Sequence, residues 1–319
     1  MAAPSPNARI FPGNSTAAGL GHDALGYGYS LAISIVHALA YVLAALLLEA
    51  ILVGWAQSSL RRLLIKPSAS AVTDIKSLLL TISPLGPLAA TILTLGLSGA
   101  ISSLTARYLQ IGLVASLSPI AVLLILLVLA DFVDYVVHRL CHAIDPLWQL
   151  HRYHHTATEM TVATGWRQHP VDLMWYYMAY GVLGGILGGS PAQLYAVFAF
   201  RLVWTGLQHS ELQWSLGPIG KFLLISPGAH RIHHSLDPKH YNSNYGTLLP
   251  IWDIAFGTFR APAEPVTVFG LPEQDLNRRF FLFEILTCYV QFLRAIPKSI
   301  RRIVAATREK LIRLSLEGR

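Results

Sequence analysis

Residues 131–155 read DFVDYVVHRLCHAIDPLWQLHRYHH and contain two of the three histidine clusters in this chain. The first cluster has the spacing HxxxH (138–142), the second reads HxxHH (151–155), and the third repeats that pattern as HRIHH (230–234). Because residues i and i+3 or i+4 share one face of a helix, each cluster can direct its imidazole nitrogens toward one point. Imidazole is the commonest protein ligand for borderline metals. The clusters therefore indicate a site for several metal ions rather than surface or packed core histidines.

The number of histidines favours two metal ions. A structural zinc site uses four ligands, often including cysteine, whereas these clusters supply eight histidines and the chain has only two cysteines, Cys141 and Cys288. Nitrogen ligands also disfavour magnesium and calcium. Zinc, copper, iron and nickel all remain open on ligand type alone. Cys141 lies inside the first cluster, and we interpret it as a small packing residue.

The composition indicates a membrane protein. The chain has 319 residues, of which 53% are hydrophobic and only 13% are charged, against roughly 25% charged in globular proteins. Its net charge of +7 is better explained by basic residues at a membrane surface than by nucleic-acid binding. The two cysteines are too few and too far apart to suggest a disulfide framework.

Four apolar regions predict membrane helices, since a crossing needs about 20 mostly apolar residues. Single spans are predicted within 27–56, 77–104 and 109–130, and prolines near the start of the second are expected to kink it. A Gly- and Pro-rich turn divides the fourth region into arms, 173–187 and 191–208. Each arm is short for a full crossing, so we expect a helical hairpin. The fold is therefore predicted to be all-α and polytopic.

The distribution of basic residues predicts the orientation of this fold. The loop between the second and third spans holds one basic residue, Arg107. The loop between the first two holds four: Arg61, Arg62, Lys66 and Lys76. The positive-inside rule makes the latter loop cytoplasmic. Two crossings and a returning hairpin then bring all three clusters and His209 to the cytoplasmic face, in a bacterial inner membrane or the endoplasmic reticulum.

Three segments are expected along the chain. Residues 1–26, rich in Ala, Gly, Pro and Ser, are predicted to be a flexible tail. Residues 27–297 are predicted to form the membrane-embedded catalytic domain, in which 210–279 cap the metal site and 280–296 lie in the membrane interface. Residues 298–319 mix Lys and Arg with Ile, Val and Leu. This composition predicts a basic amphipathic helix on an anionic membrane face.

The triple pattern HxxxH, HxxHH, HxxHH on a membrane scaffold resembles the fatty acid hydroxylase/sterol desaturase superfamily. Further segments resemble the same family: Asp134 four residues before His138, Glu159, Arg167-Gln-His169-Pro170, Gln208-His209-Ser210, Asn244-Tyr245-Gly246 and Trp252-Asp253-Ile254-Ala255-Phe256-Gly257-Thr258. The resemblance covers roughly residues 130–260. The chain departs from the family pattern at Asn242, where an acidic residue is frequent, and at Thr161, where an asparagine is frequent.

This resemblance implies a non-haem diiron centre that uses O2 to hydroxylate or desaturate an unactivated C–H bond of a membrane lipid, such as a sterol, a fatty acyl chain or a sphingoid base. The metal ligands that it implies are His138, His142, His151, His154, His155, His209, His230, His233 and His234. His169 is a further candidate, either as a ligand or as a hydrogen-bond donor behind one, and a purely structural His-Pro turn is the alternative. No catalytic residue beyond the metal ligands is expected.

Histidine ligands usually need a carboxylate or carbonyl on their second nitrogen, which orients the ring. Candidates for this supporting role are Asp131, Asp134, Glu159, Asp237 and also Asp172. Asp134 is the first choice because it precedes His138 by one helical turn.

A separate electron donor of the cytochrome b5, ferredoxin or reductase type is expected, because no such segment is evident in the chain. Two other functions stay open. A membrane zinc hydrolase would need neither reductant nor oxygen. A metal transporter would place ionisable residues along the spans, which here are nearly free of charge.

Overall fold

The computed structural model describes residues 20–317 except for short stretches, which are 98–99, 101–103, 105–106, 110, 115, 188–190, 273–276 and 278–279. The described part of the chain is helical, with one isolated β-bridge between Ser235 and Phe269. The all-α prediction is thus confirmed. Most of the expected N-terminal tail lies outside the described residues, and residues 20–26 belong to the first helix.

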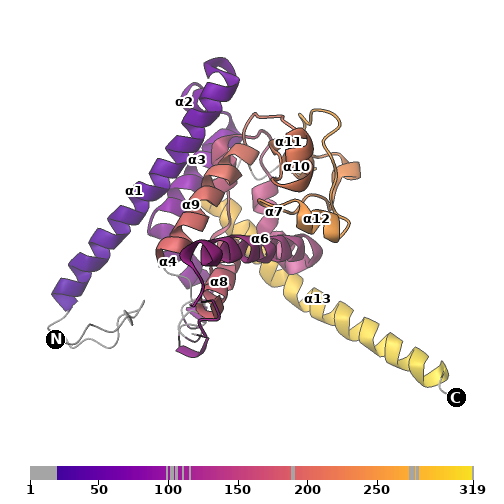
Figure 1. The fold of residues 1–319 in the computed structure, drawn as a ribbon. Coiled ribbons are helices and arrows are strands. Elements are labelled where there is room, and N and C mark those ends of the chain that lie inside the picture. Colours follow the sequence, from indigo (N-terminus) through magenta and orange to yellow (C-terminus); the bar gives the residue numbers. More distant parts are fainter. Residues whose placement is uncertain are drawn as a thin grey trace.

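The helices vary from one and a half turns to ten turns in length, and Figure 1 shows their arrangement. They are α1 (Leu20–Val53), α2 (Ser59–Leu64), α3 (Ala69–Ile82), α4 (Leu85–Leu93), α6 (Pro119–Ala143), α7 (Asp145–His155), α8 (Pro170–Leu187), α9 (Pro191–Gln208), α10 (Gly217–Phe222), α11 (Pro227–His233), α12 (Ile251–Ala255) and α13 (Phe281–Glu317). Short 3-10 turns are η1 (Trp55–Gln57), η2 (Val162–Trp166) and η3 (Pro238–His240).

Two of the described helices are long and apolar enough to cross a membrane, namely Ile35–Val53 within α1 and all of α6. A third candidate is the pair α3 and α4, which meet at a bend of 84°. The bend lies at Ser83-Pro84, because proline cannot continue the hydrogen-bond ladder and forces the preceding residue into an extended conformation. The kink that the prolines predicted is therefore confirmed, and it divides the second predicted span in two.

The helix that corresponds to the third predicted span begins and ends later in the sequence than expected. The helix α6 starts at Pro119, where the Ser118 hydroxyl accepts a hydrogen bond from the Ala121 backbone N–H and proline occupies the first turn. It then continues to Ala143, through the first histidine cluster. The predicted hairpin is confirmed as α8 and α9.

The helix α7 carries the second histidine cluster and lies at the centre of the fold. Ile144, in an extended conformation, separates it from α6. The helix α7 packs against the first half of α13, where Tyr153 of α7 contacts Ile285 and Cys288. The segment 210–272, with α10 to α12, lies beside α7 and covers the end of α6 (Figure 1). Pro297 lies inside α13, so the basic tail continues the preceding apolar helix without a break.

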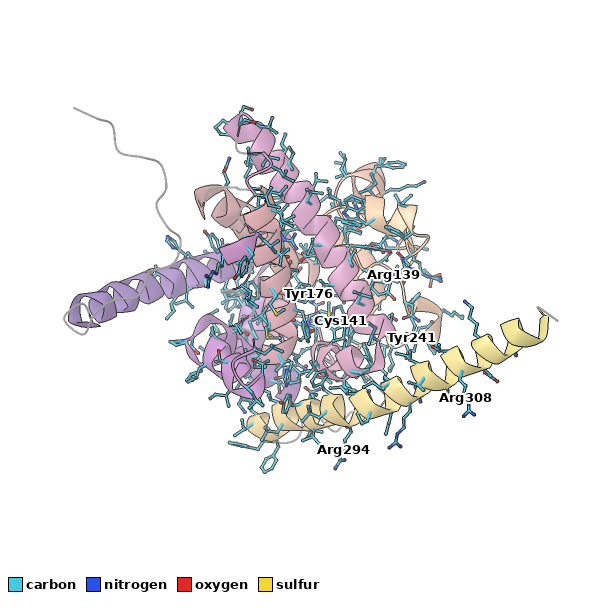
Figure 2. All side chains as sticks on the ribbon, turned by 90° about the horizontal axis from the view of Figure 1, so that it is seen from below. Arg139, Cys141, Tyr176, Tyr241, Arg294 and Arg308 are labelled. Atoms are coloured by element: carbon cyan, nitrogen blue, oxygen red, sulfur yellow. The ribbon has the colours of Figure 1, made fainter. Side chains whose placement is uncertain are left out.

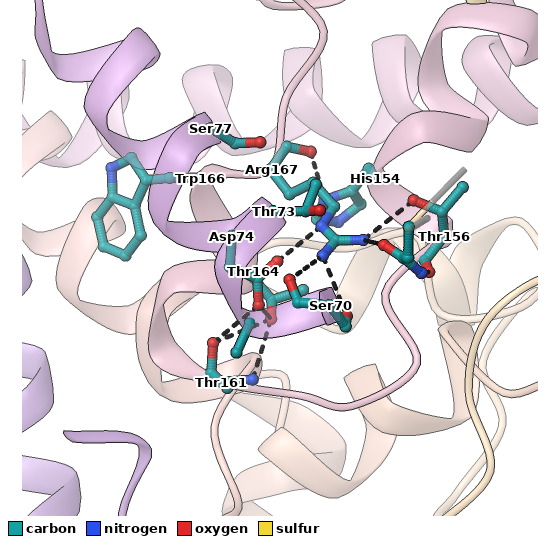
Figure 3. Close-up of polar contacts among 12 residues, drawn as sticks. Ser70, Thr73, Asp74, Ser77, His154, Thr156, Thr161, Thr164, Trp166 and Arg167 are labelled. Carbon is teal, nitrogen blue, oxygen red and sulfur yellow. Dashed lines mark hydrogen bonds and ion pairs between the residues drawn. The ribbon is translucent and has the colours of Figure 1, made fainter. Parts of the chain in front are cut away.

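A buried arginine joins these elements. The Arg167 side chain is fully buried, and its Nε donates to the Asp74 carboxylate of α3 at 2.6 Å. The same guanidinium donates to Thr156, which follows α7, to Asn277, and to Ser70 of α3. Figure 3 shows the polar contacts of this network. It fixes the start of α3 and the end of α7 against one another.

The second oxygen of Asp74 is satisfied as well. It accepts hydrogen bonds from the hydroxyls of Thr161, which precedes the η2 turn, and Thr164, which lies within it, at 3.0 and 2.7 Å. A buried ion pair that is completed by such hydrogen bonds is costly to break, because the remaining charge is left without a partner. The Arg167–Asp74 pair therefore depends on both of its members.

Replacing Arg167 with methionine is expected to lower the free energy of unfolding by about 3–5 kcal/mol, since it leaves the Asp74 carboxylate buried and uncompensated. Arg62→Met is the matched control. Arg62 is a partly exposed arginine that pairs with Glu159 and Glu211, and its loss should cost less than about 1 kcal/mol. Denaturant unfolding in detergent micelles measures both. Equal losses in the two variants would contradict a special role for the buried pair.

Candidate metal centre

Nine histidines converge in two adjoining groups. The five-histidine group consists of His138, His142, His151, His155 and His233. The four-histidine group consists of His154, His209, His230 and His234. Within each group one nitrogen from every ring lies within 4.8 Å of the others. The groups touch where the rings of His155 and His234 stack, with centroids 4.4 Å apart.

The two HxxHH clusters are each divided between the groups, which differs from the expectation that each cluster aims at one point. On α7, His151 and His155 face the five-histidine group, while His154 faces the other. Consecutive residues on a helix point about 100° apart, so neighbouring histidines cannot share one target. The third cluster on α11 is divided in the same way and thereby helps to hold the two groups side by side.

Five of the nine rings are oriented by a hydrogen bond at Nδ1. The acceptors are the carbonyl oxygens of Tyr245 for His138, Arg167 for His154, Thr205 for His209 and Ser243 for His233, and the Asp172 carboxylate for His151, at 2.7–3.2 Å. Because carbonyl and carboxylate oxygens only accept, Nδ1 carries the proton and Nε2 carries a lone pair. This is the arrangement expected of histidine ligands of a metal.

The ring nitrogens that face inward in the two groups receive no hydrogen bond from a donor. Among the described residues, six buried Nε2 atoms have no hydrogen-bond partner: those of His138, His142, His151, His155, His233 and His234. In the four-histidine group, the Nε2 of His209 lies 3.1 Å from that of His154 and 2.9 Å from that of His230. Since Nδ1 of His154 and of His209 is protonated, their facing Nε2 atoms are both lone pairs, which repel unless a cation lies between them. The donor set therefore fits metal ions.

Burial keeps these rings neutral. It lowers the pKa of His233 to about 3 and that of His209 to about 4, and neighbouring imidazoles add to the shift. Burial lowers the pKa of His154, His155 and His234 well below the ordinary value for the same reasons. Neutral imidazole is the form that binds a metal, so no proton has to leave first.

Two aspartates that bind no histidine shape the loop that orients His138. Asp253 accepts from the backbone N–H groups of Tyr245 and Gly246 at 2.8 and 2.7 Å, and the Tyr245 carbonyl then meets His138. A Cβ at Gly246 would lie 2.8 Å from the Asp253 carboxylate, which explains the glycine. Asp131 holds the next part of the loop by accepting from the backbone N–H of Leu248 and Leu249.

Asp172 orients a histidine directly, and the other predicted carboxylates have different partners. Asp134 pairs with Arg201 of α9 and Tyr180 of α8. Glu159 lies near the surface and contacts Arg62 and Ser68. Asp237 caps the η3 turn by accepting from the Lys239 backbone N–H at 3.0 Å. Asp134 was the first choice for orienting a histidine because it precedes His138 by one helical turn. Its side chain instead faces α8 and α9 rather than the two histidine groups.

His169 lies in neither group. Its Nδ1 accepts from the Val171 backbone N–H and its Nε2 donates to the Ile285 carbonyl, both at 3.2 Å. Both ring nitrogens are thus used, and the ring joins the start of α8 to α13. Burial lowers its pKa to about 4. Nearby, the buried Cys141 thiol lies 3.4 Å from the Asp172 carboxylate, where it packs behind His151.

A cavity of about 350 Å³ adjoins both groups. Four of the clustered histidines line its floor: His142, His155, His233 and His234. The remaining wall comes from Trp148 and Arg152 of α7, from Tyr241 and Asn242, and from residues 270–272. This volume lies at the lower end of the range for small-molecule sites, and it gives part of a substrate access to the nitrogens of both groups.

Replacing Asp172 with asparagine is expected to lower metal affinity about 10- to 100-fold, because the acceptor that orients His151 is weakened. Competition with a coloured chelator measures this affinity. Asp237→Asn is the control, since Asp237 contacts only a surface turn, and its affinity should match the wild type. Unchanged affinity in Asp172→Asn, or an equal loss in both variants, would contradict this assignment.

Comparison with known proteins agrees with this geometry. Residues 123–258 match the fatty acid hydroxylase family. Alkylglycerol monooxygenase of Xenopus tropicalis is 33% identical over 159 residues, which cover 50% of this chain and 34% of that protein. Ornithine lipid hydroxylase OlsE of Rhizobium tropici is 34% identical over 140 residues, 44% of this chain and 42% of that protein.

A sterol desaturase is similar over the same region. The Delta(7)-sterol 5(6)-desaturase of Aspergillus fumigatus is 29% identical over 137 residues, 41% of this chain and 37% of that protein. The chain thus spans between about a third and two fifths of these relatives' length. No solved structure gives a significant match. Residues 123–258 of this chain, which hold all nine clustered histidines, are thus a segment that matches the fatty acid hydroxylase family.

Proposed function

We propose that this chain binds two iron ions, one in each histidine group, and uses O2 to oxidise an unactivated C–H bond of a membrane lipid. The observation that carries the proposal is the pair of buried imidazole groups, whose lone pairs face one another beside an accessible cavity. The match of the same segment to the fatty acid hydroxylase family supports the reaction class.

The ligand assignment follows the two groups. His138, His142, His151, His155 and His233 would hold one ion, and His154, His209, His230 and His234 the other. Five nitrogens around one point exceed the four-coordinate, tetrahedral preference of zinc, whose catalytic sites use three protein ligands. This count favours iron over zinc. His169 has no part in the assignment, because both of its nitrogens are already hydrogen-bonded.

When bound, the two iron ions would supply the oxidant from O2 and donated electrons. The residues of this chain do the rest. Tyr245, Asp172 and the Arg167 carbonyl hold imidazole rings in a fixed orientation, so little reorganisation is needed during the reaction. Eight of the nine histidines are at most 7% exposed and His142 is partly buried, which limits the access of bulk water to the reactive centre.

The substrate that we propose is a lipid with a polar head group, and the reaction that we favour is hydroxylation. The relatives named for monooxygenation or hydroxylation reach 33–34% identity, whereas the sterol desaturase has 29%. Arg152, Tyr241 and Asn242 line the cavity and offer polar contacts. A head group would meet these side chains while a carbon of the lipid approaches the histidine floor.

The remaining parts of the proposal concern the surroundings of the site. Residues 27–297 would form the catalytic domain, with the site on the cytoplasmic face as the basic residues near α2 and α3 suggest. A separate protein of the cytochrome b5, ferredoxin or reductase type would deliver electrons. Such delivery is required because insertion of one oxygen atom from O2 consumes two electrons and two protons.

Supplying the reconstituted chain with iron, a reductase system and 18O2 tests the function. We expect an 18O-labelled hydroxylipid by mass spectrometry of the extracted lipids. His154→Ala should lose product by more than the roughly 10- to 100-fold that follows loss of a supporting hydrogen bond. His37→Ala is the matched control, because His37 is exposed on α1 and belongs to neither histidine group, so its activity should persist.

Two results would overturn the proposal. A lipid product that forms without oxygen and requires zinc would identify a membrane hydrolase. Metal flux across the vesicle, with the lipids unchanged under iron, reductant and 18O2, would identify a transporter.

A further inference from the structure

The helix α13 has two apolar faces, and one of them is uncovered. Its buried face includes Ile285, Cys288 and Ala295, which are at most 5% exposed, and the first two pack against Tyr153 of α7. On a second face, the exposed apolar stripe, the side chains are 39–61% exposed. The stripe consists of Leu282, Leu286, Leu293, Ile300 and Val304, whose spacings of four and seven residues place them on one side of the helix.

The stripe continues into a basic region that leaves the body of the protein. Every side chain from Ile300 to Lys310 is exposed. Figures 1 and 2 show this end of α13 projecting beyond the other helices, with Arg294 and Arg308 labelled along it in Figure 2. Arg294, Arg301 and Arg308, which are spaced by seven residues, border the stripe on one side, and Lys310 lies on the other side. Lys298, Arg302 and Arg313 add positive charge to the rest of this part of the helix.

We propose that α13 lies in the plane of a membrane interface and that its exposed apolar stripe and basic flanks bind an anionic phospholipid surface. A helix with an apolar face bordered by Lys and Arg can bury the apolar side chains below the head groups while the cations reach the lipid phosphates. An acidic soluble protein would match the charges but would leave the apolar stripe in water. The complementarity of both features therefore favours a lipid surface.

Two other helices are candidate membrane spans and would hold α13 near a bilayer. Ile35–Val53 and α6 are candidate spans, so the chain is already anchored beside a bilayer. Such anchoring raises the effective concentration of lipid at α13 and lets a modest surface affinity suffice. A crossing by α13 itself is disfavoured, because four cations from Arg294 to Arg302 would enter the hydrocarbon.

Binding along α13 would fix the cavity at the lipid surface. The buried face of α13 holds α7, whose residues Trp148 and Arg152 line the cavity, and Arg152 contacts Gln291 of α13 at 3.3 Å. Residues 270–272, which also line the cavity, precede α13 in the chain. This inference does not depend on which metal or reaction the site supports.

The test uses the full chain in nanodiscs that hold one copy each, labelled with an environment-sensitive thiol fluorophore. Cys141 and Cys288 are 0% exposed, so the label reports on an introduced cysteine. Val304→Cys places it on the stripe, and Glu309→Cys places the control label on the opposite side of the same helix. In discs with phosphatidylglycerol, the Val304 label should shift to the blue and resist an aqueous quencher, whereas the Glu309 label should stay accessible.

Neutralising charge tests the lipid class. Each basic residue near an anionic surface contributes about fivefold to binding, so Arg294→Gln, Arg301→Gln and Arg308→Gln together should weaken docking roughly 100-fold. Salt near 1 M, where the screening length is about 3 Å, should act similarly. The unfolding transition and the metal content of the triple variant should match the wild type.

Three outcomes would overturn the proposal. A Val304 label that stays accessible in anionic discs shows that the stripe does not meet lipid. Equal protection in purely zwitterionic discs shows that anionic lipid is not the partner. Protection that requires two copies per disc identifies the stripe as an interface between chains.

Discussion

The structure depends on a single electrostatic constraint: many neutral imidazole lone pairs face one another in a dry interior. Each buried polar atom without a partner costs about 1–3 kcal/mol, and a whole protein is stable by only about 5–15 kcal/mol. Packing alone does not account for six such Nε2 atoms, five of which belong to one group. Cations at the centres of the two groups would convert the repulsion into coordination, and the rest of the fold can be understood as the frame for that coordination.

The frame is built from backbone carbonyls and a few buried charges. Carbonyl oxygens from Tyr245, Arg167, Thr205 and Ser243 orient four rings, and these carbonyls come from three segments, because Ser243 and Tyr245 share one loop. Their positions are set in turn by the Asp253 loop contacts and by the Arg167–Asp74 pair. The charged residues nearest in sequence to the clusters thus act mostly on the backbone, and Asp172 alone among the predicted carboxylates meets a clustered ring.

Much of this arrangement can be predicted from the sequence, because it depends on the spacing of residues along individual helices. The HxxxH and HxxHH patterns and the hairpin arms predict histidines on helices that return to one place, and the nine clustered histidines are those expected. The division of each HxxHH between two groups follows from the 100° step between neighbouring residues, yet it becomes evident only when both targets are known. The start of α6 was signalled by Ser118-Pro119, a capping pair that the long apolar run before it obscured.

Contacts between residues that lie far apart in the sequence could not be predicted from it. Asp74 and Arg167 lie 93 residues apart, and Asp131 meets Leu248 across 117 residues. Such contacts arise from helix crossings rather than from any periodicity. His169 illustrates the limit, because a histidine beside a proline can serve a metal or a backbone carbonyl, and only the position of Ile285 decides between them.

Anomalous diffraction from iron-loaded crystals at the iron absorption edge tests the central claim most directly. Two peaks are expected, one enclosed by His138, His142, His151, His155 and His233, and one by His154, His209, His230 and His234. A single peak, or a peak outside both groups, would contradict the account of this protein as a two-metal site built from nine imidazoles.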